Sequence, residues 1–153
     1  MIVVDTNIVS YLWLDTKRSR RTDELHNADP FWTVPRLWRY EFMNVLAVHV
    51  HKGMVPLESA LSVWREASSA FQSCEYETDS QQVLRIAAEN KVSAYDAEFI
   101  TLAVQLGVRL VTEDRELLQK FPEIAASIEL FLQKTPKISE RTATYRAGRI
   151  KRT

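Results

Sequence analysis

Two short apolar segments, each followed by acidic residues, constrain the fold more than any other feature of the sequence. Residues 2–4 are Ile-Val-Val and lead to Asp5, and residues 107–112 are Gly-Val-Arg-Leu-Val-Thr and lead to Glu113 and Asp114. Short apolar runs rich in β-branched residues are typical of buried strands. The chain between them shows mostly the 3.6-residue periodicity of helices. The sequence therefore predicts an α/β fold, a three-layer α/β/α sandwich whose short sheet is mostly parallel.

Helices are expected from this periodicity and from the residues that start and stop helices. Their expected ranges are 7–14, 17–28, 36–52, 57–72, 80–90 and 94–106. Shorter extended segments are expected between helical stretches at 31–34, 74–77 and 128–131. Strands that alternate with helices in this way are typical of parallel sheets.

The length of 153 residues suits one domain that buries a core without disulfides. The single cysteine, Cys74, excludes an internal disulfide and a multi-thiolate zinc site. The N-terminal segment lacks the basic and apolar regions of a signal peptide, and no apolar run is long enough to span a membrane. We therefore expect a cytoplasmic protein without a membrane segment.

The net charge of zero conceals a basic C-terminus. Beyond Gln133 the chain carries seven basic residues and one acid, Glu140, which gives this segment +6 and the remainder −6. The basic residues are Lys134, Lys137, Arg141, Arg146, Arg149, Lys151 and Arg152. They could bind the phosphates of RNA, or the segment could be a solvated terminus. We expect a domain at residues 1–132 and a basic extension at residues 133–153.

Asp5 opens the segment Asp5-Thr6-Asn7 at a junction between a strand and a helix. In a parallel α/β sheet such junctions lie at the carboxyl edge, where ligands bind. Asp114 follows the second strand and is expected at the same edge, although Glu113 could be the inward acid instead. Both positions also suit a residue that caps the following helix.

Glu41 and Asp96 lie within predicted helices, on faces that otherwise look apolar. Glu41 shares a helical stripe with Leu37, Asn44 and residues 45 and 48, so we expect its carboxylate and the Asn44 amide to face inward. Burying a carboxylate is costly without a compensating partner. A pair with a nearby arginine, 36 or 39, is one alternative to a functional role.

Asp96 heads the apolar face formed by residues 99, 100, 103 and 104, and Ser93 is the expected cap of its helix. A favourable interaction with the helix N-terminus is therefore an alternative explanation for this acid. Glu98 is rotated about 200° from Asp96, and we expect it on the solvated side.

The four acids are more informative as a set than singly. Two end separate strands and two lie on inward helix faces, so one sheet edge could bring them together. Their mutual repulsion would be relieved by a divalent cation. An all-oxygen ligand set favours Mg²⁺ or Mn²⁺ over Zn²⁺. His26, His49 and His51 show no metal-ligand spacing.

The ordered motifs resemble the PIN-domain family, and within it the VapC-type toxin ribonucleases of toxin–antitoxin pairs. The resemblance covers about residues 1–131. It lies in Asp5-Thr6-Asn7, in Glu41 with Asn44, in Tyr95-Asp96-Ala97, and in the segment from Leu110 to Asp114.

The resemblance implies that Asp5, Glu41, Asp96 and Asp114 are catalytic metal ligands. Thr6, Asn7, Asn44 and Thr112 would then orient substrate, water or these ligands. It further implies Mg²⁺- or Mn²⁺-dependent hydrolysis of RNA, a cognate antitoxin and a homodimer. Two other functions stay open: a catalytically silent PIN fold that binds RNA or protein, and a Mg²⁺-binding phospho-acceptor signalling domain. The latter fits poorly, because a lysine is missing near the end of the last strand.

Overall fold

The sheet places the carboxyl ends of all its strands at one edge. The computed structural model describes residues 1–134 and residue 150. Within them the strands are β1 (Ile2–Val4), β2 (Trp32–Pro35), β3 (Glu75–Tyr76), β4 (Leu110–Val111) and β5 (Ala125–Ala126). Their order is β3-β2-β1-β4-β5, and every neighbouring pair is parallel. The first strand is therefore central, between β2 and β4.

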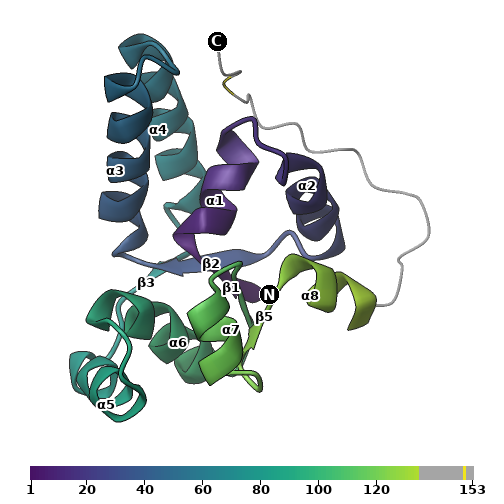
Figure 1. Cartoon of the computed structure of the whole chain (residues 1–153), viewed down its shortest axis with the longest axis vertical. Coiled ribbons are helices and arrows are strands. Elements are labelled where there is room, and N and C mark those ends of the chain that lie inside the picture. Colours follow the sequence, from purple (N-terminus) through teal and green to yellow (C-terminus); the bar gives the residue numbers. More distant parts are fainter. Residues whose placement is uncertain (135–149, 151–153) are drawn as a thin grey trace.

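Helices cover both faces of this sheet (Figure 1). They are α1 (Thr6–Trp13), α2 (Ser19–Ala28), α3 (Trp38–His51), α4 (Leu57–Phe71), α5 (Ser80–Asn90), α6 (Ala94–Leu106), α7 (Arg115–Lys120) and α8 (Ile128–Lys134). The helices α1 to α4 lie on one side of the sheet, and α5 to α7 lie on the other (Figure 1). The predicted three-layer α/β/α fold is confirmed.

Two hydrophobic clusters fill the spaces between the layers. Alternate residues of β1 point to opposite faces, so Ile2 and Val4 join one cluster and Val3 joins the other. The first cluster contains Trp38 and Phe42 of α3 and the second contains Phe99 of α6. Burial on both faces explains why the strands are continuous apolar runs.

Local start and stop signals set the ends of α5 and α6 where the sequence predicts them. Asp79 caps α5 by accepting hydrogen bonds from two backbone N–H groups, and Ser93 caps α6. Gly107 ends α6 with a φ of 63°, a left-handed conformation that glycine adopts without a steric penalty. The ends of α1 to α4 lie within two residues of those predicted.

The predicted extended segment at 128–131 is wrong, because α8 begins there. Ser127 accepts a hydrogen bond from the Leu130 N–H at 3.2 Å, and the Glu113 carboxylate accepts one from the Ile128 N–H at 3.1 Å. These two acceptors satisfy N–H groups that a helix start leaves unpaired. The fifth strand lies just before, at two alanines, and neither β5 nor α7 was predicted.

The predicted inward stripe of α3 is also wrong in part. The buried residues of α3 are Trp38, Phe42 and Leu46, spaced four apart. Glu41 is half-buried at the margin of that face, whereas Asn44 and Val48 are exposed. Aromatic packing explains the difference, because Trp38 contacts Phe42, Trp64 and Phe71.

Of the predicted basic extension, the structure describes residues 133, 134 and 150. The last helix continues through Lys134, two residues past the predicted domain limit. Ile150 bridges to Leu14 after α1, and its N–H donates to the Trp13 carbonyl at 3.3 Å. The predicted RNA-binding residues Lys137, Arg141, Arg146, Arg149, Lys151 and Arg152 lie outside the described residues. Among the helices described, none has the length and apolarity to cross a bilayer.

Candidate active site

Neighbouring strands bring Asp5 and Thr112 together at the carboxyl edge. The last residue of β1, Val4, is in register with Val111 of β4, so the residues that follow them are adjacent. The Thr112 hydroxyl donates to Asp5 Oδ2 at 2.6 Å. Asn7 Nδ2 donates to the same oxygen at 2.7 Å and lies 3.4 Å from the Thr112 hydroxyl. These contacts hold the Asp5 carboxylate in one orientation.

Asp5 is not simply the cap of α1. It occupies the N-cap position, but its side chain makes no capping hydrogen bond. Burial raises the pKa of Asp5, the Thr112 hydroxyl lowers it in part, and the charge of Asp96 raises it further. The site therefore holds a carboxylate where its negative charge is disfavoured.

Glu41 lies in the first turn of α3 and faces α1. The Thr6 hydroxyl donates to Glu41 Oε2 at 2.5 Å. Burial raises the pKa of Glu41, and the charges of Asp5 and Asp96 raise it as well, against the opposing effect of the Thr6 hydroxyl. The alternative of an arginine partner is not observed, because Arg36 pairs with Glu77 and Arg39 pairs with Glu75.

Asp96 combines a capping contact with proximity to the other acids. Its N–H donates to the Ser93 hydroxyl at 3.0 Å, and that hydroxyl donates to Asp96 Oδ2 at 2.7 Å. Its charge also raises the pKa of both Asp5 and Glu41. Asp5, Glu41 and Asp96 therefore lie within electrostatic range of one another.

Asp114 caps α7. Its Oδ1 accepts hydrogen bonds from the Glu116 N–H at 2.8 Å and the Leu117 N–H at 3.0 Å. Its own N–H donates to the Thr112 hydroxyl at 3.0 Å, which connects it to Asp5. Glu113, the other candidate at this position, pairs with Arg18 and accepts from the first N–H of α8. Glu113 therefore has a structural role, and Asp114 is the acid next to Thr112.

The donor chemistry at this edge suits a hard divalent cation. Asp5, Glu41 and Asp96 supply carboxylate oxygens, and Mg²⁺ and Mn²⁺ bind such ligands. Among the described groups that shift the pKa of Asp5 or Glu41, none is a lysine or an arginine. The Asn7 Oδ1 atom is buried and accepts no hydrogen bond in the described structure. A cation here would offset the repulsion between the carboxylates and would give the Asn7 Oδ1 atom a partner.

The described residues nevertheless include no group of three or more His, Cys, Asp or Glu side chains arranged to hold a metal ion. The proposed arrangement of four carboxylates around a common ion therefore stays a prediction. The predicted orienting role of Asn44 also stays a prediction, and its side chain is exposed on α3.

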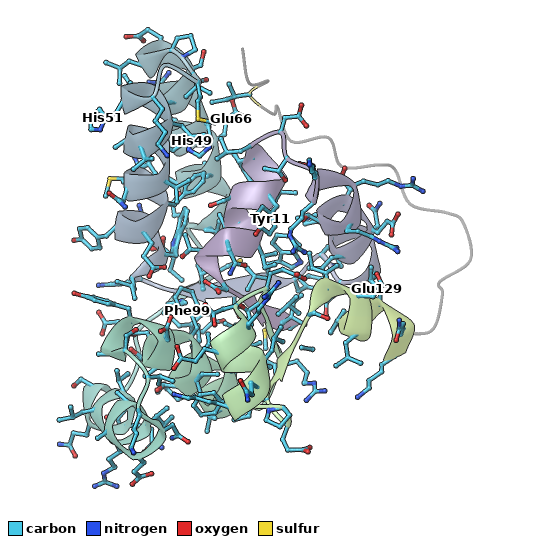
Figure 2. All side chains as sticks on the ribbon, viewed as in Figure 1. Tyr11, His49, His51, Glu66, Phe99 and Glu129 are labelled. Carbon is cyan, nitrogen blue, oxygen red and sulfur yellow. The ribbon has the colours of Figure 1, made fainter. Side chains whose placement is uncertain are left out.

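One other residue, Glu98, differs from its expected placement. Glu98 was expected on the solvated side, but it is half-buried and accepts a hydrogen bond from the Thr78 hydroxyl. His49 and His51 point to different sides of α3, as their spacing predicts (Figure 2). Lys134, the one predicted RNA-binding residue of the extension within the described part, is exposed at the end of α8.

The five-stranded parallel sheet and its acidic edge define a PIN domain. The PIN-domain sequence profile matches residues 2–124, and the chain belongs to this family. The family match gives no support to the phospho-acceptor alternative.

Two relatives from Pyrobaculum aerophilum are similar in sequence. Ribonuclease VapC3 is 28% identical over 133 residues, which cover 80% of this chain and 96% of that protein. Exonuclease VapC9 is 36% identical over 81 residues, which cover 53% of this chain and 60% of that protein.

Solved structures show the same fold. PAE2754 from Pyrobaculum aerophilum has a TM-score of 0.68 at 27% identity and covers 88% of this chain and 95% of its own. FitAcB from Neisseria gonorrhoeae has a TM-score of 0.61 at 15% identity, and the match covers 83% of this chain and 96% of that chain. FitAB bound to a DNA fragment has a TM-score of 0.64 at 15% identity, and the match covers 84% of this chain and 95% of that chain. At such low identity the last two show the likeness of fold alone.

Proposed function

We propose that this PIN domain is a Mg²⁺- or Mn²⁺-dependent endoribonuclease and the toxin of a toxin–antitoxin pair. The observation that carries the proposal is the presence of two half-buried carboxylates, Asp5 and Glu41, that contact one site and whose pKa values are raised by desolvation and by neighbouring negative charge. Carboxyl groups with a raised pKa are typical of functional sites. The similarity to a protein named Ribonuclease VapC3 supports RNA as the substrate.

Asp5, Glu41 and Asp96 would hold the cation, and Asp114 would contribute the oxygen that does not cap α7. The ion would supply an activated water and stabilise the leaving oxygen of the phosphodiester. Thr112 and Asn7 orient Asp5, and Thr6 orients Glu41, so the hydroxyl and amide donors fix the carboxylates before substrate binds. Nothing in this arrangement resembles a covalent nucleophile with its base, which favours direct hydrolysis by water.

The proposed partners are a cognate antitoxin and a second copy of the chain. Both rest on the resemblance to VapC-type toxins, which the similarity to proteins named Ribonuclease VapC3 and Exonuclease VapC9 supports. A cytoplasmic location belongs to the same proposal. Copurification with the product of the neighbouring gene would test the antitoxin.

The proposed activity is tested by cleavage of single-stranded RNA by the purified protein with Mg²⁺, Mn²⁺ or EDTA. We expect cleavage with either ion, none with EDTA, and a loss of at least about 100-fold in Asp5→Asn and in Asp96→Asn. Asp15→Asn is the matched control, because Asp15 is an exposed acid beyond the far end of α1. Undiminished cleavage in EDTA would refute the metal dependence.

The alternative is a catalytically silent PIN fold that binds RNA. The observation in its favour is that the described residues hold no group of three acids arranged for a metal. The same experiment separates the two functions, because a silent domain would bind RNA and leave it intact with every ion.

A further inference from the structure

A polar cavity lies at the carboxyl ends of β2 and β3, at the same edge of the sheet as Asp5. Its volume is about 200 Å³. The residues that line it are Arg36, Leu37, Tyr76, Glu77, Thr78 and Glu98. None of them belongs to the proposed metal site. The volume is below the range of about 300–1,000 Å³ typical of pockets for whole small ligands, so it suits a fragment such as one nucleobase.

The cavity is within reach of a nucleotide next to the scissile phosphate. Neighbouring strands are about 4.8 Å apart, so the ends of β2 and β3 lie about 5 and 10 Å from the end of β1, where Asp5 begins. The Leu37 carbonyl accepts the N–H of Glu41 at 3.3 Å, and Glu98 belongs to the same helix as Asp96, on a different side of it. The cavity and the acids are therefore built on the same elements.

The walls of the cavity are held by specific contacts. The Thr78 hydroxyl donates to Glu98 Oε2, which positions this half-buried carboxylate. Arg36 Nη1 lies 2.7 Å from Glu77 Oε1, and the Arg36 N–H donates to the Tyr76 carbonyl at 3.2 Å. Tyr76 leaves 37% of its surface exposed. The cavity thus offers a positioned carboxylate, a guanidinium and an exposed aromatic ring.

We infer that this cavity is a nucleobase subsite for the RNA and that guanine is the base it fits. This inference rests on the proposed function. A carboxylate only accepts hydrogen bonds, and guanine presents adjacent donors, N1–H and the N2 amino group. Guanine O6 and N7 accept from arginine, which Arg36 supplies. Tyr76 provides a ring on which an unpaired base can stack.

The test is the affinity of the non-cleaving Asp5→Asn variant for short unstructured RNAs that differ at one position. That position carries guanosine, inosine, which lacks the 2-amino group, or adenosine. We expect guanosine to be bound about tenfold more tightly than either, which is within the range that a bidentate base contact gives. A second measurement sequences the RNA ends produced by the otherwise unmodified chain and its variants.

The decisive variant is Glu98→Gln, made both in the Asp5→Asn chain and in the otherwise unmodified chain. Its amide oxygen still accepts from Thr78, so the fold is maintained, but one acceptor becomes a donor and the guanosine preference should disappear. Glu89→Gln is the matched control, because Glu89 is exposed on α5. Equal affinity for the three RNAs, or a preference unchanged in Glu98→Gln, would overturn the inference. Guanosine-selective binding without any RNA cleavage would instead support the subsite and contradict the nuclease function.

Discussion

Thr112 is the residue that connects the candidate site. Its side chain is fully buried, its hydroxyl donates to Asp5 Oδ2, and the same hydroxyl oxygen accepts the Asp114 N–H. One hydroxyl therefore satisfies two groups at the carboxyl edge. The resemblance to the PIN family identified Thr112 as an orienting residue, but sequence spacing alone could not show which oxygen it contacts.

Replacing Thr112 with valine should lower the free energy of unfolding by about 1–3 kcal/mol, because it removes one of the two side-chain donors to Asp5 Oδ2 and leaves the Asp114 N–H without its acceptor. Urea denaturation at neutral pH measures this change. Thr101→Val is the matched control, since Thr101 is equally buried and its hydroxyl has no hydrogen-bond partner in the described structure. The control should be neutral or stabilising. Equal effects of the two substitutions would show that the Thr112 hydrogen bonds contribute little.

Asp5 should make the stability of the metal-free protein depend on pH. Burial raises the pKa of Asp5 above its usual value of 3.8, so the folded chain binds this proton more tightly than the unfolded chain. The resulting stabilisation is complete below pH 3.8 and is lost as the pH rises through the folded pKa. At neutral pH in EDTA, Asp5→Asn should therefore melt a few degrees above the unsubstituted chain.

This difference in melting temperature should shrink as the pH is lowered toward the usual Asp value. Mg²⁺ should raise the melting temperature of the unsubstituted chain more than that of Asp5→Asn, because the ion relieves the buried charge. Thermal scans with and without Mg²⁺ measure both effects. A lower melting temperature of Asp5→Asn in EDTA at neutral pH would contradict the conclusion that the negative charge of Asp5 is disfavoured in the folded chain.

At the scale of elements, the sequence predicts those whose signals are local and strong. The continuous apolar run of β1 and the Ser93 and Gly107 boundaries of α6 each depend on a few neighbouring residues. The strand β5, which consists of two alanines, has no such signal, since alanine is uncommon in strands and the place of β5 depends on pairing with β4. The side of α3 that is buried depends on Trp38 and its aromatic contacts with α4, which no local pattern shows.

The helix α7 allows the structural and functional roles of Asp114 to be separated. Asp114→Ala removes the cap and should cost about 1 kcal/mol, whereas Asp114→Asn retains an acceptor and should cost only a few tenths. If Asp114 also binds the cation, both variants should lose RNA cleavage, because neither keeps the charge. Urea denaturation measures the contribution of Asp114 to stability, and the rate of RNA cleavage measures its contribution to activity. Full cleavage by a stable Asp114→Asn variant would limit this residue to capping.

At the scale of the whole molecule, charge is divided between the predicted domain, which is acidic, and the predicted extension, which is basic. The residues up to Gln133 carry −6 and the remainder +6. A domain of that sign repels a polyanion unless cations are supplied. The extension could supply them, and Ile150 shows that at least one of its residues returns to the domain, beside Leu14.

Replacing Lys137, Arg141, Arg146, Arg149, Lys151 and Arg152 with glutamine tests the extension while Ile150 and its contact stay in place. In an Asp5→Asn background, which binds RNA without cutting it, we expect weaker binding at low salt and a smaller salt dependence. For single-stranded RNA the slope of log K against log salt should fall by about 0.7 for each phosphate contact that is lost. Fluorescence anisotropy over a range of salt concentrations measures this slope. An unchanged slope would mean that the extension does not contact RNA, and the exposed cations of the folded domain, such as Lys134, would then have to provide the phosphate contacts.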